Sequence, residues 1–143
     1  MTDLMTEYSL AMQALMLIFA TVMAQSVIAM IAHRKQQHYV PGVVNEKLGH
    51  ESFVFRSHRT FMNSLENLPL LAGPAFIGIL GGFDPFKLGA ICWVYAVARI
   101  LHMVLYYAIA TEKNPSPRSY FFSVALLVNI VLIVMVFIHV LGA

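Results

Sequence analysis

Charged side chains are scarce in this chain of 143 residues. They make up 11% of it, against 59% hydrophobic residues, and the mean hydropathy is +0.75. A soluble domain carries roughly a quarter charged residues, so this chain is too apolar for a water-soluble core of its size. The formal charge of +2 is small, and the basic residues form no cluster interleaved with aromatic residues, which argues against nucleic acid as a partner.

Cysteine is almost absent. A single residue, Cys92, lies in the middle of an apolar run, which excludes an intrachain disulfide and a metal site built from cysteines. We expect Cys92 to pack as a small buried hydrophobic side chain, and we expect no metal.

Long apolar runs predict four membrane-spanning helices in a single domain. From Tyr8 to Ala32, 25 residues pass without a charge, and about 20 suffice to cross the hydrocarbon core. No lysine or arginine precedes this run, and it is too long for a secretory signal, so we expect it to be retained. Glycine and proline mark breaks in the rest of the chain. The domain is predicted to cover residues 1–143, with helices at about 4–33, 52–80, 86–111 and 117–141.

Basic residues gather beside the first and third predicted loops. The second loop has only Lys87, and neither terminus has any. By the positive-inside rule, the first and third loops are expected to be cytoplasmic, with both termini on the other side. The host membrane stays open between a bacterial inner membrane and the endoplasmic reticulum. The flanking basic residues are Arg34, Lys35, Lys47 and Arg56 at the first loop and Lys113 and Arg118 at the third.

Two predicted spans each carry a polar stripe on one helical face. At about 1.5 Å per residue from their cytoplasmic ends, the stripes reach matching depths of about 8 to 21 Å. An unpaired charge at mid-membrane costs about 3 kcal/mol on insertion scales, so we predict an ion pair between Glu66 and Arg99. The stripes are Arg59, Asn63 and Glu66 at i, i+4 and i+7, and Arg99, His102 and Tyr106 at i, i+3 and i+7.

Arg59 has no acidic partner at its own predicted depth. The ion pair between Glu66 and Arg99 could serve only to fix helix register, but it leaves Arg59 unexplained. An arginine without a carboxylate suggests that a ligand supplies the anion. Asn63, His102 and Tyr106 lie on the cytoplasmic side of the pair, so the two stripes predict one pocket that opens toward the cytoplasm.

Together these patterns resemble the MAPEG family, the membrane-associated proteins in eicosanoid and glutathione metabolism. The resemblance covers the whole chain in length, helix number and loop placement. It implies an all-α four-helix membrane bundle that assembles as a homotrimer, with glutathione bound between neighbouring subunits near the cytosolic face. The motifs that carry it are Arg59-x-x-x-Asn63-x-x-Glu66-x-x-Pro69 and Arg99-x-x-His102-x-x-x-Tyr106.

The resemblance also implies roles for single residues. Arg118 matches the arginine at the start of the fourth helix that activates the thiol, and a fixed guanidinium lowers the pKa of a thiol by stabilising the thiolate. This match depends on how the preceding loop, which is a few residues longer than in the eicosanoid synthases, is folded. The catalytic residue implied is Arg118, and the glutathione-binding residues are Arg59, Asn63, Glu66, His102, Tyr106 and Arg34, the last reaching across the subunit boundary.

Two functions stay open at this point. The first is a detoxifying enzyme, a glutathione transferase or peroxidase that acts on lipophilic electrophiles or lipid hydroperoxides from the bilayer. The second is a non-catalytic lipid-binding membrane protein that resembles the five-lipoxygenase-activating protein. A small multidrug transporter is expected to carry a carboxylate in its first span, which this chain lacks. A haem site needs paired axial ligands, whereas His58 and His102 lie on different helices at different depths.

Overall fold

The computed structural model describes residues 2–142, which fold into α-helices joined by loops, without a strand among them. The prediction of an all-helical chain is confirmed. The predicted domain limits, residues 1 and 143, lie outside the described residues. The helices are α1 (Thr2–Glu7), α2 (Ser9–Arg34), α3 (Phe53–Leu80), α4 (Pro85–Ala108) and α5 (Pro117–Gly142).

Tyr8 separates α1 from α2 and splits the first predicted helix, residues 4–33, in two. Its φ of −97° and ψ of 17° depart from helical values. The Tyr8 side chain is 1% exposed, and its hydroxyl donates a hydrogen bond to the carbonyl oxygen of Phe83 at 2.6 Å. A buried hydroxyl needs a partner, so this contact fixes the start of α2 against the turn between α3 and α4.

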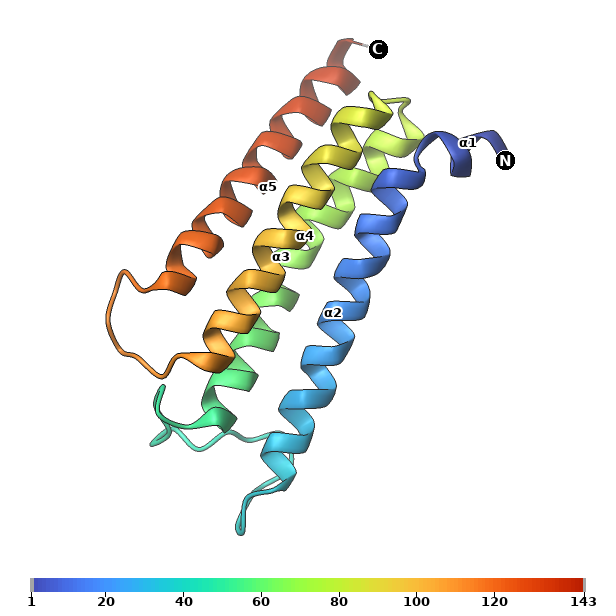
Figure 1. Cartoon of the computed structure of the whole chain (residues 1–143). Helices are drawn as coiled ribbons and strands as arrows, with labels where there is room; N and C mark the ends of the chain where they lie inside the picture. The colour runs from blue at the N-terminus through green and yellow to red at the C-terminus, as the bar shows by residue number, and fades with distance from the viewer. Residues whose placement is uncertain (1, 143) are drawn as a thin grey trace.

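The long helices α2 to α5 run side by side, with both chain ends at one end of the bundle and the two longer loops at the other (Figure 1). α3 and α4 form the predicted hairpin around Gly82, whose φ of +70° suits glycine. Asp84 then caps α4 by accepting a hydrogen bond from the Lys87 backbone N–H at 2.9 Å. α3 and α4 lie at the centre, because each contacts the other three long helices.

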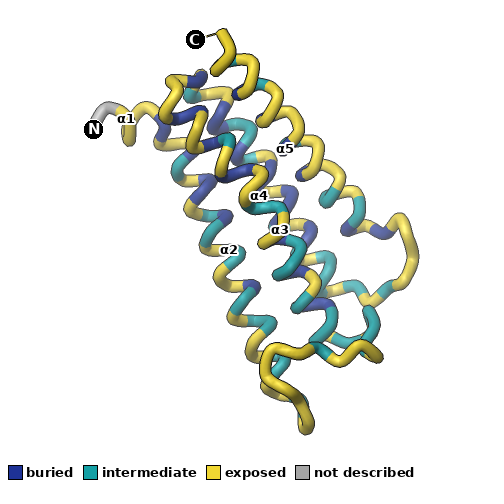
Figure 2. The backbone as a smooth tube through the Cα atoms, turned by 180° about the vertical axis from the view of Figure 1, so that it is seen from behind, coloured by how far each residue is buried: buried dark blue, intermediate teal, exposed yellow. Residues whose placement is uncertain are grey.

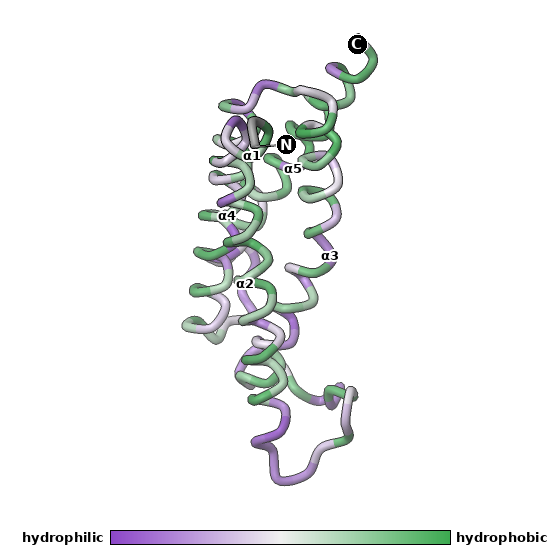
Figure 3. The backbone as a smooth tube through the Cα atoms, turned by 90° about the vertical axis from the view of Figure 1, so that its right-hand side faces the viewer, coloured by the Kyte–Doolittle hydropathy of each residue, from purple (hydrophilic) through white to green (hydrophobic). Residues whose placement is uncertain are grey.

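Three helices of the described chain, α2, α4 and α5, are long and apolar enough to cross a membrane. Together they identify a membrane protein. α3 is longer, at 28 residues, but its first half contains Arg56, Arg59 and Glu66, so its passage through the membrane remains a prediction. The hydrophilic stretch of the first loop lies beyond the apolar helices (Figure 3).

Buried side chains divide the bundle into two zones. Apolar side chains fill the end that holds the chain termini, and most buried polar side chains lie toward the loops, where fewer positions are buried (Figure 2). Cys92 belongs to the apolar zone and is 0% exposed, as expected. The polar zone contains Arg56, Ser57, Thr60, Ser64, Arg99, His102, Ser116 and Arg118.

Gly89 generates a testable prediction about the packing of α4 on α2. A methyl group at this position would lie 2.6 to 2.9 Å from three atoms of Leu10, including its Cβ. Because a Cβ atom cannot rotate away, the helices would have to separate, at an overpacking cost of about 1 to 3 kcal/mol. We predict that Gly89→Ala lowers the Tm of the purified protein in detergent by several degrees.

The control is Gly142→Ala at the end of α5, where nothing beyond the neighbouring residues and the helix's own backbone lies within 4 Å of the added methyl group. Alanine favours a helix over glycine by about 1 kcal/mol, so this variant should keep or raise the Tm. A loss of the same size in both variants would contradict the proposed close approach of α2 and α4.

Candidate functional site

The predicted site residues separate into three groups in the single chain. One group lies on the outer side of α3, a second lies between α4 and α5 near the third loop, and a single arginine lies beside a cavity near the first loop. The groups are Arg59, Asn63 and Glu66; His102, Tyr106 and Arg118; and Arg34.

Arg59, Asn63 and Glu66 form a row that points out of the bundle, hereafter the α3 row. Arg59 and Glu66 are exposed, and neither side chain takes part in a hydrogen bond or ion pair with another residue between 2 and 142. Asn63 is half-buried, and its Oδ1 atom is buried without a hydrogen-bond donor from the described chain. The α3 row therefore presents a cation, an amide and a carboxylate to whatever covers this face.

The predicted ion pair between Glu66 and Arg99 is wrong. Arg99 Nη2 instead donates a hydrogen bond to Ser64 Oγ at 2.8 Å, and this bond is buried between α3 and α4. Residues 64 and 66 are about 200° apart around a helix of 3.6 residues per turn. Because Ser64 faces α4, Glu66 faces away from it, and the two polar stripes do not share a pocket within one chain.

Ser64 went unrecognised in the sequence, although a signal was present. Ser57, Thr60 and Ser64 follow at i, i+3 and i+7, and all three are buried, with exposures of 0 to 4%. Small polar residues at this spacing mark a face on which helices approach closely in membranes. That second stripe is the one directed toward the bundle interior.

The third predicted helix, residues 86–111, ends at Ala108, and the chain then folds back toward the start of α5. Ile109 has extended backbone, with φ −111° and ψ 111°. Arg118 Nη2 donates to the carbonyl oxygen of Thr111 at 2.9 Å, and Nη1 donates to that of Ile109 at 3.4 Å. Arg118 thus stabilises the loop with part of its guanidinium.

The loop's greater length does not carry Arg118 away from α4. Its guanidinium lies over the Tyr106 ring, 4.1 Å from the ring centroid, a distance typical of a cation–π contact. The His102 ring lies 5.5 Å from that of Tyr106. Two residues of one predicted motif therefore meet the separately predicted Arg118 in one cluster, in which the cation is 9% exposed.

His50, which the sequence did not single out, joins this cluster to both loops. Its Nε2 atom lies 3.0 Å from the Tyr106 hydroxyl, and its Nδ1 atom lies 2.9 Å from Glu112 Oε1. The His50 backbone N–H donates to the same carboxylate oxygen at 2.9 Å. These bonds, the backbone one first, hold the pKa of Glu112 below its usual value. His50 and Glu112 are 62 positions apart in the sequence. The only indication of their contact was the prediction that the first and third loops lie at the same end of the bundle.

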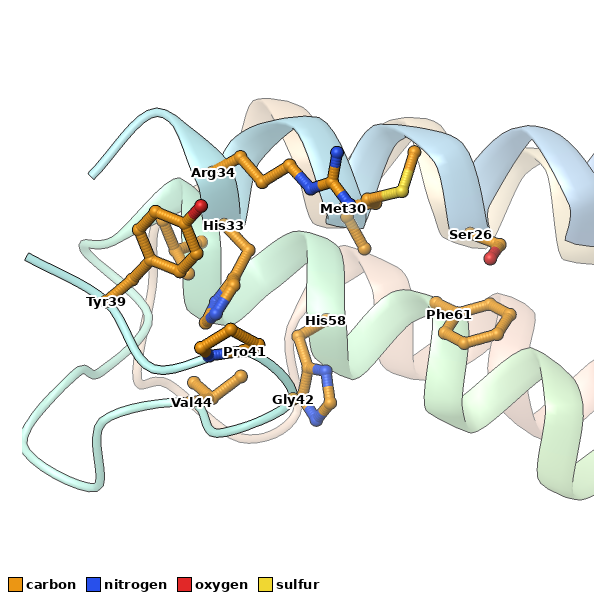
Figure 4. Close-up of a pocket in the computed structure, with 12 residues that line it drawn as sticks. Ser26, Met30, His33, Arg34, Tyr39, Pro41, Gly42, Val44, His58 and Phe61 are labelled. Carbon is orange, nitrogen blue, oxygen red and sulfur yellow. The ribbon is translucent and has the colours of Figure 1, made fainter.

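Arg34 lies beside a cavity of about 360 Å³ between the end of α2, the first loop and the start of α3 (Figure 4). His33 and His58 also line it, and Met30 and Phe61 contribute apolar surface. The Arg34 side chain extends along α2 toward Met30 (Figure 4). The cavity thus combines a cation, two imidazoles and an apolar wall at the loop end of the bundle.

Glu112 yields a prediction about pH. Its pKa is lower in the folded chain than the ordinary value of 4.5, so its bonds to His50 stabilise the fold above about pH 4.5. That contribution is lost as the pH falls through the lowered pKa. We predict that Glu112→Gln lowers the Tm at pH 6 and that the gap to wild type closes at acid pH. Glu46→Gln, in the first loop, is the control, and a gap that persists at the acid limit would contradict this assignment.

Comparison with known proteins gives one match. The family model described as the MAPEG family matches residues 8–138, nearly the whole chain. No curated protein and no solved structure gives a significant match. The matched region includes the α3 row, the cluster around Arg118 and the cavity beside Arg34, so the resemblance inferred from the motifs is confirmed. The chain belongs to the MAPEG family.

Proposed function

We propose that the protein is a glutathione-dependent membrane transferase or peroxidase that acts on lipophilic electrophiles or lipid hydroperoxides. The observation that carries the proposal is the α3 row, which points out of the chain from a helix packed among apolar ones. Membership of a family linked to glutathione metabolism supports this ligand. Because that family also includes non-enzymatic members, binding and catalysis need separate tests.

The α3 row cannot face lipid without a large cost. Arg59 and Glu66 lie about 9 and 20 Å from the start of α3, and a charge at membrane depth costs about 3 kcal/mol on insertion scales. A second copy of the chain that covers this face removes the charges from lipid. We therefore propose a homotrimer, a closed ring in which each subunit covers the row of its neighbour.

Glutathione offers chemical groups that suit the α3 row. The Arg59 guanidinium can hold a carboxylate with two parallel hydrogen bonds, and the Glu66 carboxylate can accept from the ammonium group. The half-buried Asn63 amide can exchange a hydrogen bond with a peptide group. His102 and Tyr106 lie beside Arg118 and not beside the row, so we propose that they contact the thiol end of the ligand.

The cavity beside Arg34 is proposed to supply the other wall of the site. Its volume of about 360 Å³ falls within the roughly 300 to 1,000 Å³ of small-molecule pockets. Arg34 of one subunit would then face the α3 row of the next, so that two cations hold the two carboxylates of the tripeptide. The loop end of the bundle is proposed to face the cytoplasm, the compartment in which glutathione is abundant.

Arg118 is proposed to activate the thiol. Two of its five N–H groups donate to loop carbonyls, and the others remain to stabilise a thiolate. A guanidinium does this without taking the proton itself, because its own pKa is far higher. The thiolate sulfur then bonds to the electrophilic carbon as the leaving group departs with its electron pair. With a hydroperoxide, the thiolate sulfur bonds to the terminal oxygen as the O–O bond breaks, which gives a sulfenic acid, and the alkoxide leaves as the alcohol with the proton that the thiol had released. A second glutathione then reduces the sulfenic acid to the disulfide with release of water.

Thiolate absorbance in the ultraviolet tests the enzymatic proposal. When glutathione is mixed with the purified protein at neutral pH, we predict that thiolate forms on the protein and that Arg118→Ala lowers its fraction by about tenfold, the equivalent of one pKa unit. Arg118→Lys, which keeps the charge, should retain part of it. Lys113→Ala changes a neighbouring loop cation and should retain all of it. Tight binding of glutathione with no thiolate would favour the non-catalytic lipid-binding alternative.

Glu66 gives a separate test of binding. Since its carboxylate is exposed and unpaired in the single chain, Glu66→Gln should have little effect on the Tm without glutathione. If the carboxylate holds the ammonium group, the rise in Tm at a fixed glutathione concentration should shrink in the variant, because stabilisation follows the ratio of ligand concentration to Kd. An unchanged glutathione-dependent rise would remove Glu66 from the site.

A further inference from the structure

A second polar site lies inside the bundle, apart from the proposed glutathione contacts. Gln25 from α2, Ser64 from α3 and Arg99 from α4 line a small cavity of about 10 Å³. This volume is about what one water-sized species requires. Three helices thus each contribute a polar side chain to one cavity. Its other walls are Ile18, Thr21, Val22, Tyr95, Ala96 and Ile100.

Most polar atoms around this cavity lack a partner within the described chain. Arg99 is 4% exposed, and its Nε and Nη1 atoms are buried without an acceptor, although Nη2 donates to Ser64. Gln25 is 0% exposed, and both polar atoms of its amide are unpartnered. Buried polar groups in folded proteins almost always have a partner, so the unpartnered N–H groups of this cluster point to a bound acceptor.

The missing species has to compensate a positive charge. The ion pairs between residues 2 and 142 are His50 with Glu112 and Lys87 with Asp84, and neither involves Arg99. Arg99 lies nine residues before the end of α4, about 14 Å along the helix, in a segment apolar enough to cross a membrane. A guanidinium at that depth without a carboxylate is strongly disfavoured.

We propose that this cavity binds a monatomic anion, chloride, as the counter-ion of Arg99. The donors are one of the unpartnered N–H groups of Arg99, the Nε2 group of Gln25 and the hydroxyl proton of Ser64, whose oxygen already accepts from Arg99. The volume is too small for a carboxylate, a phosphate or glutathione. The ion holds α2, α3 and α4 together through one side chain from each. This site goes beyond the proposed function and does not require glutathione.

Halide dependence of stability tests the site without any ligand of the enzyme. The purified wild-type protein is unfolded by heat in sodium chloride, sodium bromide or sodium gluconate at one ionic strength. We expect the Tm to be about 4 °C higher in either halide than in gluconate once the halide exceeds its Kd tenfold. Crystals grown in bromide should give an anomalous scattering peak within hydrogen-bonding distance of Arg99.

Two variants separate this site from general salt effects. Arg99→Gln should abolish the halide-dependent shift, whereas Arg59→Gln, which changes an exposed arginine, should retain it. If Arg99→Gln does not fold, Gln25→Leu keeps the guanidinium but removes a donor, and it should reduce the shift. Equal Tm values for the wild type in all three salts, with no bromide peak, would mean that water fills the cavity and would overturn the proposal. A shift lost equally in Arg59→Gln would also overturn it.

Discussion

Polar side chains in a bundle of membrane-length helices have to be turned away from lipid, and the contact between Ser64 and Arg99 decides how this chain does so. The hydrogen bond places the small polar face of α3 against α4. Because a helix is rigid, the same bond turns Arg59 and Glu66 to the opposite side, where their side chains have no partner among residues 2–142. One buried contact thus sets both the interior of the protomer and the face proposed for a neighbouring subunit.

The two zones of the bundle differ in the contacts that hold their side chains. At the end with the chain termini, apolar side chains pack closely, and the Tyr8 hydroxyl secures α2 to the α3–α4 turn. At the loop end, buried residues such as Arg118 are polar, and they are held by side-chain contacts and loop carbonyls. In the polar zone, nitrogen atoms of Arg56, Arg99 and His102 are buried without a partner from the described chain.

Most of the fold could be predicted from the sequence, because charge-free runs and proline or glycine breaks act locally. The split at Tyr8 could not, since it depends on a hydrogen bond to Phe83, 75 positions away. For the site, helical spacing predicted that the α3 row shares a face and that the motifs belong to the family. Spacing does not give the rotation of a helix about its axis, which tertiary packing sets. Glu66 and Ser64 lie at nearly the same depth along α3. A prediction based on depth alone therefore paired Arg99 with Glu66 and not with Ser64.

The position of His50 has a mechanical consequence. One imidazole contacts Tyr106 at the end of α4 and Glu112 in the third loop, and the backbone beside it accepts from Arg56 at the start of α3. The segments 35–52 and 109–116, which are separated by two long helices along the chain, are therefore joined to each other through one residue. Strain applied to either segment is transmitted to the other through this side chain, without passing along the helices between them.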